Sequence, residues 1–210
     1  TTTRLIAHMV KTMGYKVGFT TTDGIYIQNR MLERGDCTGP KSAEFVLRDP
    51  TVDFAVLECA RGGILRAGLG FHNCDIGIVT NIAEDHLGLK DINTIEDMAR
   101  VKAVVPESVL PEGYAILNAD DDLVFNMSKS LECKICLFSL DATNPRILKH
   151  CEDGGLAAVV EDGYITICKG TWKIREDKVV NIPLTFSGKA ILMIQNILPA
   201  VLAGFVRNFK

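Results

Sequence analysis

The sequence lacks several features that would place it in a specialised class. No run of Lys or Arg stands out among its 23 basic and 26 acidic residues, and the net charge is −3, which disfavours a nucleic-acid partner. No secretory signal pattern opens it. Its one long apolar run, Ala190–Val206, is interrupted by Gln195, Asn196 and Pro199, which favours a buried helix over a membrane span. We therefore expect no nucleic-acid partner and no membrane insertion.

The sequence also lacks a paired set of cysteine motifs. Its seven cysteines are scattered, which is typical of reduced thiols and predicts a cytoplasmic protein. Cys133 and Cys136 form a C-x-x-C, but no second pair of that spacing completes a structural zinc site. A redox C-x-x-C would open a helix, whereas this one leads into the strand-like CLFS. The pattern favours two small buried hydrophobes over a metal or redox site.

What the sequence does have is an alternation of apolar strands and amphipathic helices. Short β-type runs are expected at 16–20, 54–58, 76–80, 114–118 and 136–139, and helices at 5–13, 43–47, 94–105, 120–130 and 190–205. Thr94 is the expected N-cap of its helix, with Asp97 in the capping-box position. Residues 21–43 are polar and turn-rich and are expected to form a long loop. The alternation predicts an α/β fold with a mostly parallel sheet flanked by helices.

After residue 155 the alternation of strands and helices gives way to consecutive β-type runs. Two β runs surround Asp162-Gly163, which is a hairpin signal, and β character continues from Trp172. These hairpins predict a small antiparallel β subsheet attached to the parallel one. Because the chain has 210 residues, is 47% hydrophobic and shows no low-complexity linker, we expect one domain over residues 1–210.

Polar residues follow each candidate parallel strand. They are Thr20–Gly24, then Glu58 with Arg61–Gly63, then Thr80–Asn81 with Glu84–His86, then Asn118 with Asp120–Asp122. In an open α/β sheet, ligands bind beyond the carboxyl ends of the strands. The sequence therefore predicts a binding site along this edge.

Taken singly, the chemically capable residues all have a structural interpretation, and some of them keep a functional one beside it. Glu58 either caps a neighbouring structure or holds a divalent cation, which takes oxygen ligands. His86 is either a packing histidine or a site residue. Lys102 lies among valines and, taken alone, is most simply a surface lysine with a packed stem. Arg61–Gly63 either approach an anionic ligand or form only a turn. The acidic run Asp120–Asp122 is most simply an N-cap with first-turn acids that complement the helix dipole.

The chain contains seven motifs in this order: TTTR, TTTDGIY, LECARGGILR, NIAEDHLG, ARVKAVV, NADDD and IQNILPA. Together they resemble the central ATPase domain of the Mur ligase family. The resemblance runs nearly end to end. It implies a P-loop NTPase-like sheet and an ATP-dependent acid–amino acid ligase, in which ATP phosphorylates a carboxylate and an amine displaces phosphate from the acyl phosphate. It also implies that the family's G-x-x-G-K-T phosphate loop precedes Thr1 and that a C-terminal domain follows residue 210. We therefore expect these 210 residues alone to be inactive and to bind ATP poorly.

Longer strings, such as TTTDGIYI and GDCTGPKSA, resemble one branch of that family in particular. The resemblance implies that arginine is added to the β-carboxyl of an aspartate chain. Two alternatives stay open. One is another Mur-type ligase, acting on folylpolyglutamate or peptidoglycan precursors, and the other is a non-catalytic nucleotide-binding module.

Site residues follow from the resemblance by position. It implies that Glu58, His86 and Lys102 are catalytic and hold Mg²⁺, with Lys102 carbamylated so that its carbamate helps to hold a second Mg²⁺. It implies nucleotide contacts from Thr1, Thr2, Asn118 and Asn196, although the first asparagine of the family's N-x-x-N falls on Met193. Contacts to arginine and to an acidic acceptor are expected from Thr21, Thr22, Asp23, Arg61, Gly62, Gly63 and Arg66. The expected partners are these small substrates, other domains of the same polypeptide and, as an open alternative, a second copy of the chain.

Overall fold

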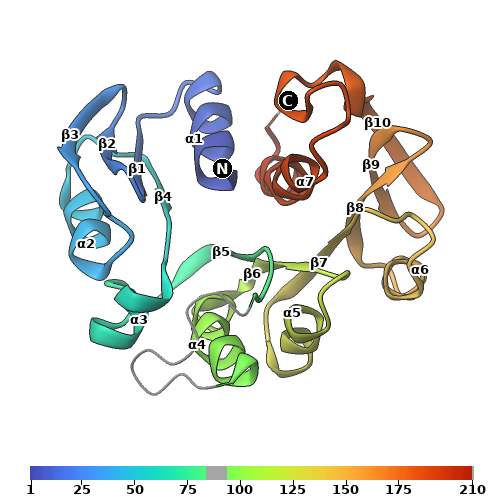
Figure 1. The fold of residues 1–210 in the computed structure, drawn as a ribbon, viewed down its shortest axis with the longest axis horizontal. Helices are drawn as coiled ribbons and strands as arrows, with labels where there is room; N and C mark the ends of the chain where they lie inside the picture. Colours follow the sequence, from blue (N-terminus) through green and yellow to red (C-terminus); the bar gives the residue numbers. More distant parts are fainter. Residues whose placement is uncertain (84–93, 210) are drawn as a thin grey trace. The chain divides into compact units, whose positions relative to one another are not determined.

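The computed structural model of the protein describes residues 1–83 and 94–209 (Figure 1). They fall into two compact units, each mixed α/β. The first unit holds Thr1–Cys74 together with the chain from Gly204 onward, and the second holds Asp75–Ala203. The predicted α/β class is confirmed, and both sheets contain parallel as well as antiparallel strand pairs.

The first unit is built on a four-stranded sheet of order β3-β2-β1-β4. Its strands are β1 (Val17–Thr21), β2 (Gly24–Ile27), β3 (Arg30–Arg34) and β4 (Phe54–Leu57). β1 and β4 run parallel, while β1–β2 and β2–β3 are antiparallel. The prediction of one long loop over residues 21–43 was therefore wrong. β3 is an edge strand exposed at all five positions, so it carries no apolar alternation that would reveal it.

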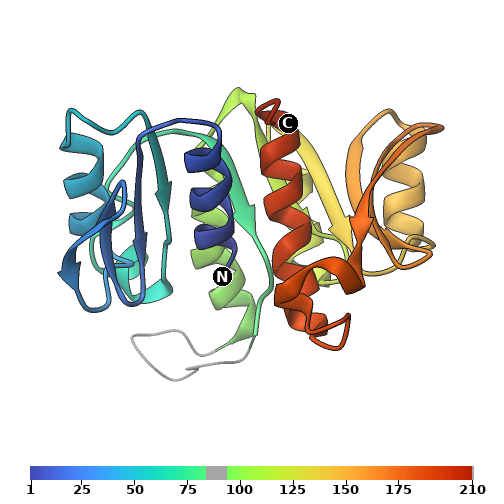
Figure 2. The same ribbon diagram turned by 90° about the horizontal axis from the view of Figure 1, so that it is seen from above.

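Three helices belong to this unit: α1 (Thr2–Thr12), α2 (Pro40–Arg48) and α3 (Arg61–Ala67). α1 buries Ile6, Ala7 and Val10 and packs against β1 and β4. Figures 1 and 2 show α1 and α2 on opposite sides of the sheet. α2 approaches so closely that a Cβ on Gly18 of β1 would lie 2.6 Å from Val46 Cγ1. The expected helices at 5–13 and 43–47 are confirmed, with ends shifted by a few residues.

The second unit is built on a six-stranded sheet of order β10-β9-β8-β7-β6-β5. Its strands are β5 (Cys74–Val79), β6 (Val109–Asn118), β7 (Lys134–Ser139), β8 (Leu156–Glu161), β9 (Tyr164–Lys169) and β10 (Trp172–Lys178). β6, β7 and β8 are parallel, and β8, β9 and β10 are antiparallel, which confirms the predicted subsheet. Asp162 and Gly163 both have positive φ, as a type I′ hairpin turn requires.

The helices of this unit are α4 (Ile95–Glu107), α5 (Asp122–Met127), α6 (Pro145–Glu152) and α7 (Ile191–Val206), with 3₁₀ turns at Ser128–Ser130, Val179–Asn181 and Pro183–Thr185. The expected capping box is confirmed, because Thr94 and Asp97 exchange side chain-to-backbone hydrogen bonds of 3.1 Å. Figure 1 shows α4, α5 and α6 along one face of the sheet. Through the part of the chain that the structure describes, no helix combines the length and apolar character needed to cross a membrane.

The cysteines confirm the interpretation of the C-x-x-C as packing. Cys136 on β7 is fully buried, Cys133 is buried just before it, and both are free thiols. Burial raises the pKa of Cys136 to about 12, which leaves it protonated and unreactive at neutral pH.

Candidate functional site

In the first unit, polar groups gather where β1 and β4 end. The two strands are parallel, so their carboxyl ends meet, and the Glu58 N–H donates to Thr20 Oγ1 over 3.1 Å. Burial raises the pKa of Glu58, and the amino group of Thr1 opposes that rise, which places the start of α1 within electrostatic reach of this carboxylate. Within residues 1–83 and 94–209 the Glu58 carboxylate accepts no hydrogen bond. A half-buried, unpartnered carboxylate of this kind fits a cation.

Asp23 is hydrogen-bonded to three neighbouring side chains. Its carboxylate accepts hydrogen bonds from Thr21 Oγ1 at 2.5 Å, from Tyr26 Oη at 2.6 Å and from the Arg4 guanidinium. These donors, Arg4 first, hold the pKa of Asp23 well below its usual range. Asp23 therefore ties the first turn of α1 to the turn between β1 and β2. Thr22 is exposed in that turn.

The Arg61-Gly62-Gly63 stretch is the first turn of α3, so the alternative that it forms only a turn between elements is wrong. A Cβ on Gly63 would lie 2.9 Å from Gly39 Cα, so this glycine lets α3 pack against the segment before α2. Gly62 has no such constraint, because the nearest atom to its added Cβ would be Arg66 Nη2 at 3.8 Å. Arg66 Nε donates to the Gly62 carbonyl at 2.8 Å.

In the second unit, an open pocket of about 390 Å³ lies at the carboxyl ends of β5 and β6. It is lined by Asn81, Ile82, Ile95, Asn118, Asp120, Asp121, Asp122, Leu123 and Gln195. This is the kind of place that the strand-end argument predicts. Asn81 was not among the expected nucleotide residues, although its position directly after an apolar strand could have identified it.

Asn118 lines this pocket and also builds it. Its Nδ2 donates to the Thr80 carbonyl at 2.8 Å, and its Oδ1 accepts from the Asp120 N–H at 2.9 Å. The side chain is buried, with 1% exposed. It therefore joins the end of β5 to the turn after β6, and both of its polar groups are engaged inside the protein.

Asp121 is the N-cap of α5, as the acidic run predicted. Its Oδ1 accepts from the N–H groups of Leu123 and Val124, each at 3.0 Å. Its Oδ2 accepts from the Ile82 N–H at 2.7 Å, a contact that the sequence did not reveal. One carboxylate thus fixes both the start of α5 and the loop after β5.

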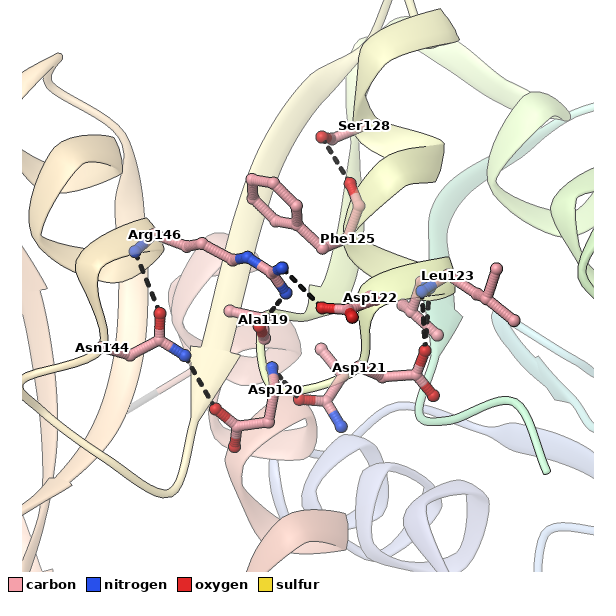
Figure 3. Close-up of polar contacts among 11 residues, drawn as sticks. Ala119, Asp120, Asp121, Asp122, Leu123, Phe125, Ser128, Asn144 and Arg146 are labelled. Atoms are coloured by element: carbon pink, nitrogen blue, oxygen red, sulfur yellow. Dashed lines mark hydrogen bonds and ion pairs between the residues drawn. The ribbon is translucent and has the colours of Figure 1, made fainter.

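Asp120 and Asp122, which flank Asp121, are hydrogen-bonded by residues from the region 139–146 (Figure 3). Asp120 accepts from Ser139 Oγ at 2.5 Å, from the Leu140 N–H at 2.8 Å and from Asn144 Nδ2 at 2.9 Å. Asp122 pairs with Arg146, whose Nη2 lies 2.5 Å from Asp122 Oδ1. The acidic run is therefore occupied by protein donors. No group of three or more His, Cys, Asp or Glu able to hold a metal occurs among the described residues.

Lys102 on α4 reaches the loop that carries the pocket. Its Nζ donates to the Asn81 carbonyl at 2.9 Å, so the expected catalytic lysine lies beside a pocket residue. His86 lies outside the described residues. Gln195 lines the pocket, whereas Asn196 donates its Nδ2 to the Leu192 carbonyl one turn back along α7, over 2.8 Å. The joint roles expected for Glu58, His86 and Lys102 stay predictions.

Comparison with known proteins gives a family match over nearly the whole chain. Residues 1–204 match the family described as Mur ligase middle domain. The chain is 57% identical over 208 residues to a cyanophycin synthetase from Geminocystis herdmanii, covering 99% of this chain and 24% of that protein. It is 54% identical over 208 residues to a cyanophycin synthetase from Synechocystis sp., with the same coverage. The chain thus spans about a quarter of the length of the curated relatives it matches.

Solved structures agree on the fold. A UDP-N-acetylmuramoyl-L-alanyl-D-glutamate–2,6-diaminopimelate ligase superposes with a TM-score of 0.73 at 20% identity, covering 100% of this chain and 41% of that one. A MurF ligase from Thermotoga maritima, solved in complex with ADP, superposes with a TM-score of 0.57 at 14% identity, covering 100% and 43%. At these identities the likeness concerns the fold alone.

Proposed function

The chain belongs to the Mur ligase family and corresponds to its middle domain. From that premise we propose that it is the nucleotide-binding part of an ATP-dependent acid–amino acid ligase. We further propose that this ligase makes cyanophycin. The observation that carries the proposal is the pocket at the carboxyl ends of β5 and β6. Its volume of about 390 Å³ lies in the range of small-molecule sites, and Asn81 and Asn118 are among the residues that line it. Relatives at 57% and 54% identity carry the name cyanophycin synthetase.

ATP is the nucleotide we propose, supported by the family structure described as a complex with ADP. The reaction would phosphorylate a carboxylate and let an amine displace phosphate from the acyl phosphate. Mg²⁺ would supply charge neutralisation on the transferring phosphoryl group. Glu58 fits that ion, because its carboxylate is desolvated and accepts no hydrogen bond from a described residue. We propose Lys102, as a carbamate, and His86 as the remaining Mg²⁺ residues, and Thr1 and Thr2 as phosphate-side contacts.

Arginine and an aspartate-chain acceptor are the substrates we propose, and the residues that we propose for them all belong to the first unit. Asp23 is engaged by Arg4, Thr21 and Tyr26, so it would shape the site rather than contact the acceptor. Thr22 is exposed on the same turn and is the better candidate for direct contact. Arg61 and Arg66, at the start and in the last turn of α3, would face the acidic acceptor. The other domains of the longer protein would complete the site, and the free cysteines are compatible with the cytoplasmic home expected from the sequence.

The test uses the full-length protein that carries this chain. Phosphate release from ATP should require both arginine and a short aspartate-chain primer. Lys102→Ala should lower that rate by about 100-fold or more, since it removes a group proposed to act on the transferring phosphate. Lys129→Ala is the matched control, because Lys129 is an exposed lysine of the same unit and lies outside the pocket, and it should keep the wild-type rate.

Other outcomes select the alternatives. Phosphate release that needs a different acceptor, such as a folate or a peptidoglycan precursor, would assign the chain to another Mur-type ligase. ATP binding with no acceptor-dependent turnover, and with equal rates for wild type and Lys102→Ala, would leave a non-catalytic nucleotide-binding module.

A further inference from the structure

The pocket wall in the second unit presents an electrostatic problem. Three successive carboxylates, Asp120, Asp121 and Asp122, line a pocket proposed to take a polyanion. Like charges at a binding site repel an anionic ligand and raise its dissociation constant unless they are compensated.

Two of the three carboxylates are stabilised by hydrogen bonds from neutral donors. Asp121 accepts from three backbone N–H groups and lies at the positive end of α5. Asp120 accepts from a hydroxyl, a backbone N–H and the Asn144 amide. Asp122 differs, because it pairs with a full positive charge, the Arg146 guanidinium.

Arg146 is held in place at three points (Figure 3). Its Nη2 donates to Asp122 at 2.5 Å, its Nη1 donates to the Ala119 carbonyl at 2.9 Å, and its guanidinium carbon lies 4.5 Å from the Phe125 ring centroid. Its backbone N–H donates to Asn144 Oδ1, which caps α6. The planar guanidinium can make these hydrogen bonds and the ring stack at the same time.

We propose that Arg146 is a positioning residue that sets nucleotide affinity by neutralising Asp122 at the pocket wall. The inference rests on the proposed function, because it presupposes a nucleotide in this pocket. Arg146 is not one of the pocket-lining residues and would act through Asp122. The side chain of Asp122 is 80% exposed, so the ion pair contributes little to folding stability while its charge is open to solvent and to a ligand.

The chain offers a matched control. Arg175 makes the same kind of contact in the same unit, with its Nη2 2.6 Å from Asp162 Oδ2 and its guanidinium 5.1 Å from the Tyr164 ring centroid. Neither Arg175 nor Asp162 lines the pocket. Arg175→Met therefore removes an exposed ion pair and a stack without touching the proposed site.

The experiment is titration calorimetry of ADP into the full-length protein at low and high salt. Arg146→Met should raise the Kd for ADP about tenfold at low salt, equivalent to about 1.4 kcal/mol, and by much less at about 0.5 M NaCl, where the charge is screened. Arg175→Met should leave the Kd within about twofold of wild type. In the Arg146→Met background, Asp122→Asn should restore most of the affinity, because it removes the unpaired carboxylate. Arg146→Lys, which keeps the charge, should stay close to wild type, and Arg146→Gln, which removes it, serves if the Met variant folds poorly.

Several results would overturn the inference alone. These are wild-type affinity in Arg146→Met, an equal loss in Arg175→Met, or no recovery on adding Asp122→Asn. If the wild-type protein itself binds no ADP, the proposed function fails and this inference fails with it, so the two failures are distinguishable.

Discussion

We expect Asp121→Ala to lower the free energy of unfolding more than substitution of the neighbouring Asp122 does. The substitution removes the N-cap of α5 and also the acceptor of the Ile82 N–H, which lies on a separate loop. The sequence alone predicts only that Asp121 caps α5. The structure therefore predicts a larger effect than a lost cap.

The magnitude follows from the hydrogen bonds. Loss of an Asp N-cap costs about 1 kcal/mol. Loss of a carboxylate bond to the Ile82 N–H, in a residue only 8% exposed, adds about 1.5 to 3 kcal/mol because that donor is left buried and unpaired. The free energy of unfolding should therefore fall by about 3 kcal/mol, and the melting temperature by roughly 10 °C.

Two measurements check this prediction. Chemical denaturation gives the change in the free energy of unfolding, and hydrogen exchange gives the protection of the amides of Ile82, Leu123 and Val124. Asp122→Ala is the control, since it removes an exposed aspartate from the same turn whose partner is Arg146, and it should cost less than about 1 kcal/mol. Equal losses in the two variants, or unchanged protection of Ile82 in Asp121→Ala, would refute the reasoning.

Further predictions concern the first unit. Burial raises the folded-state pKa of Glu58, so the stability that its protonation contributes is fully present below the unfolded pKa and is lost as pH rises through the folded pKa. Without Mg²⁺ or nucleotide, Glu58→Gln should therefore have a higher melting temperature than wild type at pH 8 and the same melting temperature at low pH. Equal melting temperatures of the two proteins at both pH values would show that burying the Glu58 carboxylate does not destabilise the fold. Gly63→Ala should destabilise the protein by about 1 to 3 kcal/mol, because its Cβ would lie 2.9 Å from Gly39 Cα. Gly62→Ala in the same helix should be neutral or stabilising by up to about 1 kcal/mol, and denaturation curves that rank the two alike would contradict the packing account.

Local signals were sufficient for much of the fold. Thr94 and Asp97 predict the start of α4 because a capping box is made within four consecutive residues. Asp162-Gly163 predicts the β8–β9 hairpin because both positions need positive φ. The edge strand β3 was not predicted, because a strand without a buried face shows no alternation of apolar and polar residues. α6 was also missed, although Asn144 and Pro145 are N-cap and first-turn residues of the usual kinds.

The candidate site was predictable in position and only partly in detail. The polar residues after β5 and β6 indicate a site there, and the pocket lies at that edge. The partner of each polar residue was not predictable. Asp23 looked available for a substrate, yet Arg4, Thr21 and Tyr26 occupy it.

The α/β class, the order of most elements and the family could be predicted from the amino-acid sequence, because each rests on short-range periodicity or on motifs contiguous in the chain. Which polar groups meet became known only from the folded structure. Asp121 with Ile82, and Arg146 with Asp122, are separated by 39 and 24 residues. Contacts at such distances depend on how strands pair and helices pack, and no local pattern records them. The pocket wall is built from these contacts.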